Sequence, residues 1–251
     1  MTQRLAERQR PASSPVGKQR WNHLLFTHWR VAPSAVQATL PPGLMVDTHE
    51  GAAFVGVVPF FMERIRPQWL PPIPWVSWFL ELNVRTYVHD RDGRPGVWFY
   101  SLDCNQPLAV AIGRRFFHLP YFHAQMSARH TQDRIEYRSR RRGDAAESGF
   151  AWREIGDETE THPGSLEFFL VERYLLFTVG GDGALCSGRV HHRPYRVRSA
   201  ELNSYSTRPA ALAGFEVSDP PVSVLSASAV DVSVHAVERL SAAAQPLPPR
   251  D

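Results

Sequence analysis

With 251 residues, of which 43% are hydrophobic, the chain can bury the core of one large domain or two small ones. Its 28 basic and 25 acidic side chains leave a net charge of +3, too small to indicate a nucleic-acid partner. Two cysteines cannot make a disulfide framework, no apolar run is long enough to span a membrane, and no secretion signal precedes the first motifs. We therefore expect a cytoplasmic protein without membrane or nucleic-acid partners.

The two ends of the chain differ in composition from the rest. Residues 1–19 are polar with prolines and paired serines, and residues 241–251 are rich in alanine and proline, so we expect both to be disordered tails. The intervening residues 20–240 contain no linker and no repeat, which predicts one domain.

Strands are expected to dominate the first half of that domain. A short helix over 32–39 precedes a β-rich run over 52–62, in which Pro59 indicates a sheet edge or a bulge. Residues 81–89 and 96–103 flank a short turn, which is the pattern of a hairpin.

The second half is expected to combine a strand meander with two helices. The predicted helices cover 108–117 and 165–177, and the predicted strands cover 121–129, 133–141, 150–155 and 185–197. Many antiparallel strands with few helices indicate an α+β fold or a β-barrel with covering helices.

A series of motifs between residues 21 and 202 resembles one protein family. In chain order they are WNHLLFTHW (21–29), LPPGL (40–44), VVPF (57–60), ELNVRTYV (81–88), RRFFHLPY (114–121), FLVERY (169–174) and GRVHH (188–192). Together they resemble the YqjF-like family of uncharacterised bacterial proteins, which is similar in fold to acetoacetate decarboxylase. The resemblance implies a predominantly antiparallel, strongly bent, closed β-structure around an internal pocket, with a few covering helices.

The segment around Arg114 also resembles the active-site segment of acetoacetate decarboxylases. There a proline is followed by two lysines, and the first lysine forms a Schiff base with the substrate ketone. Here Arg114 and Pro120 match, whereas the lysine positions are Tyr121 and Phe122. A Schiff base needs a primary amine, and Lys18 is the only lysine of the chain. The sequence therefore excludes Schiff-base chemistry from this position, and we expect no cofactor.

One strand carries an unusual set of polar residues. Alternate side chains of a strand share a face, so Glu81, Asn83, Arg85 and Tyr87 line one side of the 81–88 strand. This side faces either water or the interior, where unpaired charges are costly and need each other or a ligand. The resemblance, in which Glu81 corresponds to a pocket glutamate, favours the interior.

These residues and the Arg114 segment provide the candidate site. Glu81 would move protons, and Tyr121 would polarise a carbonyl oxygen. Arg114 would hold a carboxylate through two parallel hydrogen bonds, although a cation at a helix end is often structural. The remaining candidate binding residues are Asn83, His191 and Arg85. Of these, Arg85 would fix Glu81.

Other motifs have plainer interpretations. His191 and His192 are adjacent, so a regular strand cannot aim both at one ion, and we expect no metal. Glu172 and Arg173 lie in a long apolar stretch, which favours a structural ion pair. The arginine-rich segment 138–142 fits a solvated turn. An apolar loop with Trp69, Trp75 and Trp78 could cap a pocket or cover a dimer interface.

The sequence leaves three functions open. The first is a lysine-independent enzyme with a buried pocket for a small organic acid or oxo compound. The second is a non-catalytic protein that binds such a compound. The third is a structural homo-oligomer without a ligand, in which Glu81 would be locked to Arg85 or Arg114 and the interior would contain no cavity.

Overall fold

A computed structural model describes residues 2–132 and 134–240. In these residues it contains five short helices and fifteen strands. The helices are α1 (Thr2–Ala6), α2 (Pro33–Gln37), α3 (Pro107–Phe116), α4 (Leu166–Val171) and α5 (Arg208–Leu212). The strands are β1 (Gly17–Asn22), β2 (Leu24–Val31), β3 (Leu44–Val46), β4 (Ala53–Pro67), β5 (Phe79–Asp90), β6 (Pro95–Cys104), β7 (Tyr121–His130), β8 (Ile135–Arg141), β9 (Ser148–Glu160), β10 (Leu175–Val179), β11 (Leu185–His191), β12 (Arg196–Ser204), β13 (Ser223–Ala227), β14 (Val230–Val234) and β15 (Glu238–Arg239).

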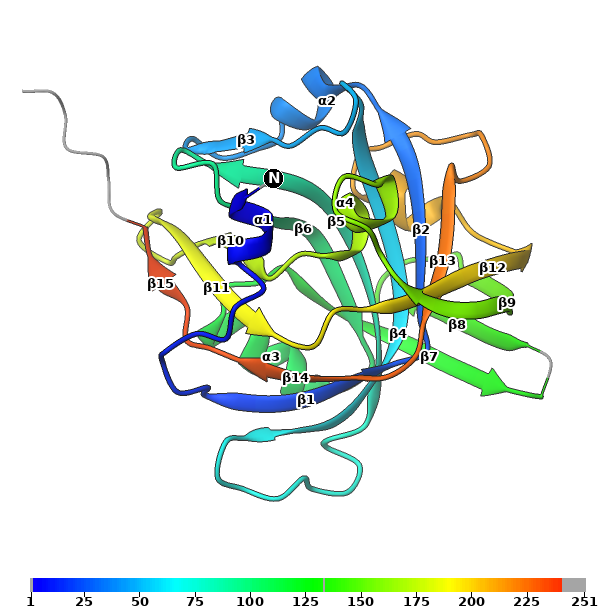
Figure 1. Ribbon diagram of the computed structural model, residues 1–251. Helices are drawn as coiled ribbons and strands as arrows, with labels where there is room; N and C mark the ends of the chain where they lie inside the picture. The colour runs from blue at the N-terminus through cyan, green and yellow to red at the C-terminus, as the bar shows by residue number, and fades with distance from the viewer. Residues whose placement is uncertain (1, 133, 241–251) are drawn as a thin grey trace, which may run out of the picture.

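The described strands form one strongly bent sheet (Figure 1). Its order is β1-β14-β11-β10-β6-β7-β8-β9-β12-β13-β2-β4-β5-β3, with β15 beside β11. Two further pairings, β1 with β4 and β5 with β6, close the sheet on itself. Strand β6 runs parallel to β7 and β10, and the other ladders of the described strands are antiparallel. The predominantly antiparallel, bent and closed structure expected from the resemblance is confirmed.

The central strands β4, β5 and β6 separate two apolar cores. On one face, Leu82 and Val84 of β5 pack in a core with Trp152. On the other face, Tyr87 packs in a core with Phe26 of β2 and Phe169 of α4. Because strand side chains alternate, Glu81, Asn83 and Arg85 share the face of Tyr87 and are buried with it. The polar face of β5 therefore lies inside the protein.

Pro59 lies at a change of strand partner. Residues 53–57 of β4 pair with β2, and residues 61–67 pair with β1. Pro59 falls between these two ladders and opposes Leu82 of β5. A proline has no N–H to donate, so this gap between two neighbouring strands accommodates it without the loss of a ladder hydrogen bond.

The short helix 32–39, the hairpin of 81–89 with 96–103, the helix 108–117 and the meander are confirmed. The predicted helix 165–177 is wrong, because α4 ends at Val171 and residues 175–179 form β10 between β11 and β6. A continuous apolar run does not distinguish a buried helix from a strand that is buried on both faces. The predicted strand 185–197 is interrupted around Pro194, so that β11 and β12 are separate strands.

The N-terminal residues also differ from the expected tail of 1–19. They form α1, an ordered arm and the start of β1, which pairs with β14 and β4. The predicted C-terminal tail, 241–251, lies outside the described residues. No helix in the described part of the chain is long and apolar enough to cross a membrane.

Candidate functional site

Glu81 is a buried carboxyl group on the inner face of β5. It is paired across the sheet with Phe60 of β4 and Cys104 of β6, and only 3% of the residue is exposed. The Tyr121 hydroxyl donates a hydrogen bond of 2.9 Å to its Oε2 atom. Burial raises the pKa of Glu81 to about 8, and the bond from Tyr121 opposes this only in part. Glu81 is therefore protonated at neutral pH and can act as an acid.

Tyr121 is fixed from two sides. It begins β7, which runs parallel to β6, and its ring lies against Gly113 of α3. A Cβ atom on Gly113 would lie 2.4 Å from Tyr121 Cδ2, so only glycine lets the helix approach this closely. Burial and the neighbouring Glu81 raise the pKa of Tyr121 well above its usual range, so its hydroxyl stays a donor.

Arg114, in contrast, lies outside the interior. Its side chain is exposed, its Nε donates a 2.6 Å hydrogen bond to the Tyr121 backbone oxygen, and its guanidinium lies 5.8 Å from the Phe122 ring. The helix end directs Arg114 toward the surface, so it holds the backbone of Tyr121 and does not face Glu81.

Arg85 is a buried cation on the same face of β5 as Glu81. Its Nη2 donates to the Leu170 backbone oxygen at 3.2 Å and its Nε to the Tyr87 hydroxyl at 3.4 Å. The guanidinium also lies over the rings of Phe26 and Tyr87, at 5.4 and 5.7 Å from their centroids. Among residues 2–132 and 134–240, no carboxylate forms an ion pair with Arg85.

Arg85 does not fix Glu81 in this structure. The two residues are four positions apart on β5, roughly 13 Å along the strand, and Asn83 lies between them on the same face. The buried Oδ1 atom of Asn83 has no hydrogen-bond partner in the described part of the chain. In the described part of the chain Glu81 is therefore not locked to Arg85 or Arg114, the pairing expected for a purely structural role, and its side-chain partner is the Tyr121 hydroxyl.

His28 is an interior residue that sequence reasoning missed. Its Nε2 lies 2.6 Å from the Tyr87 hydroxyl, and Gly56 leaves the room for this contact, because a Cβ there would lie 3.0 Å from the His28 ring. Burial, with Arg85 nearby, lowers the pKa of His28 well below its usual range and keeps the ring neutral. His28 and Tyr87 lie on separate strands, β2 and β5, so no spacing pattern in the sequence predicts their contact.

His192 is buried, whereas the predicted binding residue His191 is half-buried. The His192 Nδ1 atom lies 2.7 Å from the Arg193 backbone oxygen and must carry the proton, since a carbonyl only accepts. Burial lowers the pKa of His192 to about 4, so its Nε2 is a free acceptor, and it has no partner among the described residues. Its ring lies 5.8 Å from that of Trp21, whose Nε1 donor is also unpartnered there.

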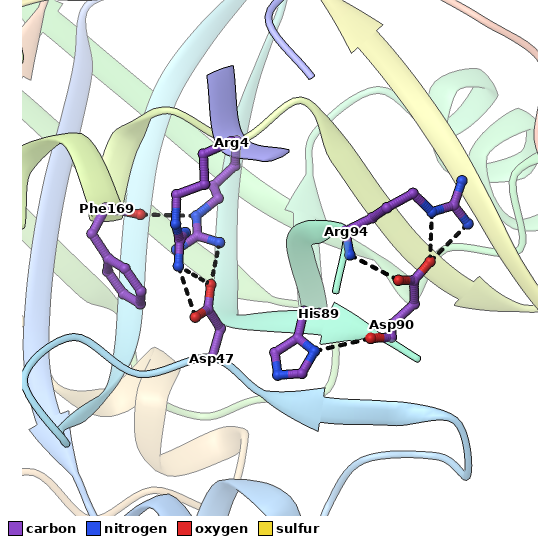
Figure 2. Close-up of polar contacts among 7 residues, drawn as sticks. Arg4, Asp47, His89, Asp90, Arg94 and Phe169 are labelled. Atoms are coloured by element: carbon purple, nitrogen blue, oxygen red, sulfur yellow. Dashed lines mark hydrogen bonds and ion pairs between the residues drawn. The ribbon is translucent and has the colours of Figure 1, made fainter. Parts of the chain in front are cut away.

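A second set of buried charges is fully paired. Asp47 accepts hydrogen bonds from Arg4 of the N-terminal arm and from Arg173 (Figure 2 shows the Arg4 contact). Glu172 accepts from Arg8 at 3.2 Å and from the Tyr174 hydroxyl at 2.5 Å. The structural ion pairs expected for Glu172 and Arg173 are confirmed.

Two depressions on the surface of the described residues, of about 380 and 390 Å³, are not lined by the interior polar residues. The first lies over Arg140–Asp144 and the second lies beside Trp98 and Phe177. Within the described residues, no group of three histidine, cysteine or acidic side chains is arranged to hold a metal ion.

Comparisons with known proteins agree with the fold. The model of the DUF2071 family, described as an uncharacterized conserved protein, matches residues 18–231. The uncharacterized protein YqjF of Bacillus subtilis is 40% identical over 207 residues, which cover 80% of this chain and 84% of YqjF.

Solved structures of enzymes share the architecture at low sequence identity. The enduracididine biosynthesis enzyme MppR, complexed with pyruvate, has a TM-score of 0.63 at 15% identity and covers 93% of both chains. Acetoacetate decarboxylase from Legionella pneumophila has a TM-score of 0.62 at 16% identity and covers 94% of both. These similarities establish an acetoacetate-decarboxylase-like fold.

Proposed function

The chain belongs to the DUF2071 family, and we propose that its interior binds a small organic acid or oxo compound on the inner face of β5. In this proposal Arg85 holds the carboxylate. Asn83 is next to Arg85 on the same face and contacts the same acid, whereas the Glu81–Tyr121 pair is a separate donor pair for the oxo group of a ligand long enough to reach it. The function is lysine-independent, since Tyr121 occupies the position of the Schiff-base lysine.

The observation that carries the proposal is the buried guanidinium of Arg85, which has no carboxylate partner among the residues that the structure describes. A buried cation costs several kcal/mol unless an anion and hydrogen bonds compensate for the lost water. The two adjacent rings supply only part of this compensation, at about 0.5–2 kcal/mol each. A ligand carboxylate would complete it through two parallel hydrogen bonds.

The chemistry at Glu81 fits an oxo group. A protonated carboxyl group and a tyrosine hydroxyl are both donors, and both can bond to a carbonyl oxygen. Glu81 can give its proton to that oxygen and later take one back, which is general acid and base catalysis near neutral pH. Arg114 and His191, which the sequence included in the site, are left outside this arrangement.

The solved relatives support the ligand class. MppR has been crystallised with pyruvate, and acetoacetate decarboxylase is named for a 3-oxo acid. Both compounds carry one carboxylate, which is the group that Arg85 would recognise, and both are too short to span the roughly 13 Å to Glu81.

A thermal-shift screen with pyruvate and other 2-oxo and 3-oxo acids tests the proposal. An acid at 100 times its Kd should stabilise the wild type by about 2.7 kcal/mol, which raises Tm by roughly 5–10 °C. The exposed-site variant Arg114→Ala should respond like the wild type, and Arg85→Met should not respond. An equal response of Arg85→Met, or no response of the wild type to any acid, would refute the assignment.

A non-catalytic binding protein is the second candidate. The absence of a lysine at position 121 favours this candidate, because it removes the Schiff-base chemistry from that position, and the chain has no lysine other than Lys18. Proton NMR of the bound acid over several hours distinguishes the two, because an enzyme converts the acid and a binding protein leaves it unchanged.

A further inference from the structure

Exposed apolar side chains gather on two segments that a hydrogen bond joins, here called the apolar face. It combines the loop 68–78 between β4 and β5 with helix α3. Its members and their exposed fractions are Trp69 77%, Leu70 46%, Ile73 55%, Trp75 90%, Trp78 42%, Leu108 50%, Ile112 41% and Phe116 66%.

The loop holds a defined shape. The Ile73 N–H donates to the Ser77 hydroxyl at 2.8 Å, and the Ser77 N–H donates to the Ile73 carbonyl at 2.9 Å. The Gln106 side chain, at the start of α3, donates to the Trp75 carbonyl at 2.9 Å and so joins the loop to the helix. In Figure 1 the loop projects beyond the sheet at the ends of β4 and β5.

Trp75 is held in an uncommon conformation that displays its ring. Its φ angle is +66°, which is unfavourable for a bulky residue, by on the order of 1–3 kcal/mol. The bonded loop maintains this backbone while the side chain stays 90% exposed. The Trp75 side chain gains no packing within the chain from this strained backbone. Backbone strain of this kind is typical of functional positions, such as those that contact a partner.

Helix α3 contributes a stripe beside the loop. Leu108, Ile112 and Phe116 are spaced four residues apart and lie on one side of the helix, whereas Val110 and Gly113 face the protein body. No charged residue occurs in 68–78 or in 107–113, and Arg114 and Arg115 lie at the edge of the stripe. Aromatic enrichment and charge depletion with a polar rim are typical of an interface core.

We propose that the apolar face is the interface with a second copy of this chain, the loop of each copy packing on α3 of the other. The four aromatic side chains alone leave roughly 500 Å² open, and four aliphatic side chains enlarge this area. Apolar patches on monomers rarely exceed about 300–600 Å², and a stable dimer buries about 800 Å² on each partner. A two-fold axis would place both reciprocal loop–helix contacts in one closed interface.

This proposal is independent of the interior site, and sedimentation velocity tests it. The protein concentration should be about 50 µM, which exceeds the micromolar dissociation constants of the weakest interfaces of this size. At this concentration the wild type should sediment as a dimer, with twice the chain mass of 28.4 kDa. Trp69→Ser/Trp75→Ser and, separately, Ile112→Glu should sediment as monomers. Their melting temperatures should stay near that of monomeric wild type at high dilution, because these side chains are exposed.

The matched control is Leu212→Glu on α5, where an apolar residue of similar exposure, 43%, lies outside the apolar face. It should remain dimeric. A monomeric wild type, or a dimer that survives either set of substitutions, overturns the proposal. Monomeric wild type that cosediments with phosphatidylserine-containing vesicles, while the double tryptophan variant does not, would assign the face to a membrane surface and also overturn it.

Discussion

The inner face of β5 and the N-terminal ion-pair network bury the same kinds of side chain in opposite ways. In the network, Asp47 meets Arg4 and Arg173, and Glu172 meets Arg8. On β5, Glu81 is bonded only to a tyrosine hydroxyl, and Arg85 is bonded only to neutral groups, as far as the described residues show.

This difference in pairing distinguishes buried charges that stabilise the fold from buried charges that have no ionic partner and could bind a ligand. The two charges of a buried ion pair compensate for part of the lost hydration, and the removal of one partner destabilises the fold because the other charge stays buried. An unpaired buried group instead either changes its protonation, as Glu81 does, or keeps a cost that a ligand can remove. The network therefore holds the N-terminal arm on the sheet, and in the proposed function β5 would offer a cation and an acid group to a ligand.

The largest expected effect is a pH-dependent gain of stability in Glu81→Gln. In the unfolded chain the pKa of Glu81 is near 4.5, and in the folded protein it is about 8. The folded state therefore retains the proton while the unfolded state releases it, and wild-type stability falls as the pH rises from 4.5 to 8. Above pH 8, Glu81→Gln should be more stable than wild type by up to about 5 kcal/mol.

Urea unfolding from pH 4.5 to 9 measures this difference. The two proteins should be similar near pH 4.5 and diverge steadily above it. A constant difference across the range would mean that Glu81 is ionised in the folded protein at all these pH values, so that the contrast between the two regions fails.

A second prediction compares the two buried arginines directly. Arg173→Met leaves Asp47 with Arg4 as its remaining cation and should destabilise the protein by about 3 kcal/mol, the low end for a broken buried pair. Arg85→Met leaves no buried carboxylate without a partner. The free energy of unfolding of this variant should therefore lie within about 1 kcal/mol of the wild-type value or above it. Equal losses in both variants, measured by urea unfolding at pH 7, would show that Arg85 has an internal partner.

The smallest effect concerns the hydroxyl groups around Glu81. Tyr121→Phe removes the bond to the carboxyl group and should cost about 1 kcal/mol at pH 6. Because that bond lowers the pKa of Glu81, the variant should also continue to lose stability to a higher pH than wild type.

Tyr137→Phe is the matched control for this shift. Its buried hydroxyl donates to the Glu81 and Phe60 backbone oxygens, so the variant should also lose stability. It should keep the wild-type pH profile. A similar displacement of both profiles would remove the assigned role of the Tyr121 bond.

Strand alternation and the family resemblance predicted the part of the site that lies on one element. Glu81, Asn83 and Arg85 share the interior face because side chains of a strand alternate, whatever the strand packs against. Tyr121 followed from its position in the decarboxylase-like segment. The hairpin and the meander followed from short turns between β-rich runs.

Features that depend on tertiary contacts were not predictable. Arg114 turns outward because of how α3 packs on Tyr121, and the His28–Tyr87 contact needs Gly56 on a third strand. Which of His191 and His192 is buried depends on the interruption before β12. The end of α4 depends on the pairing of β10 with two distant strands.

The most direct test of the account is an isothermal calorimetric titration of the most stabilising oxo acid into wild type and Arg85→Met at pH 7. The account predicts saturable binding of one acid per chain to wild type and no measurable heat of binding to the folded variant. Binding of equal affinity to both proteins would contradict it, because the acid would then be held without the unpaired cation of β5.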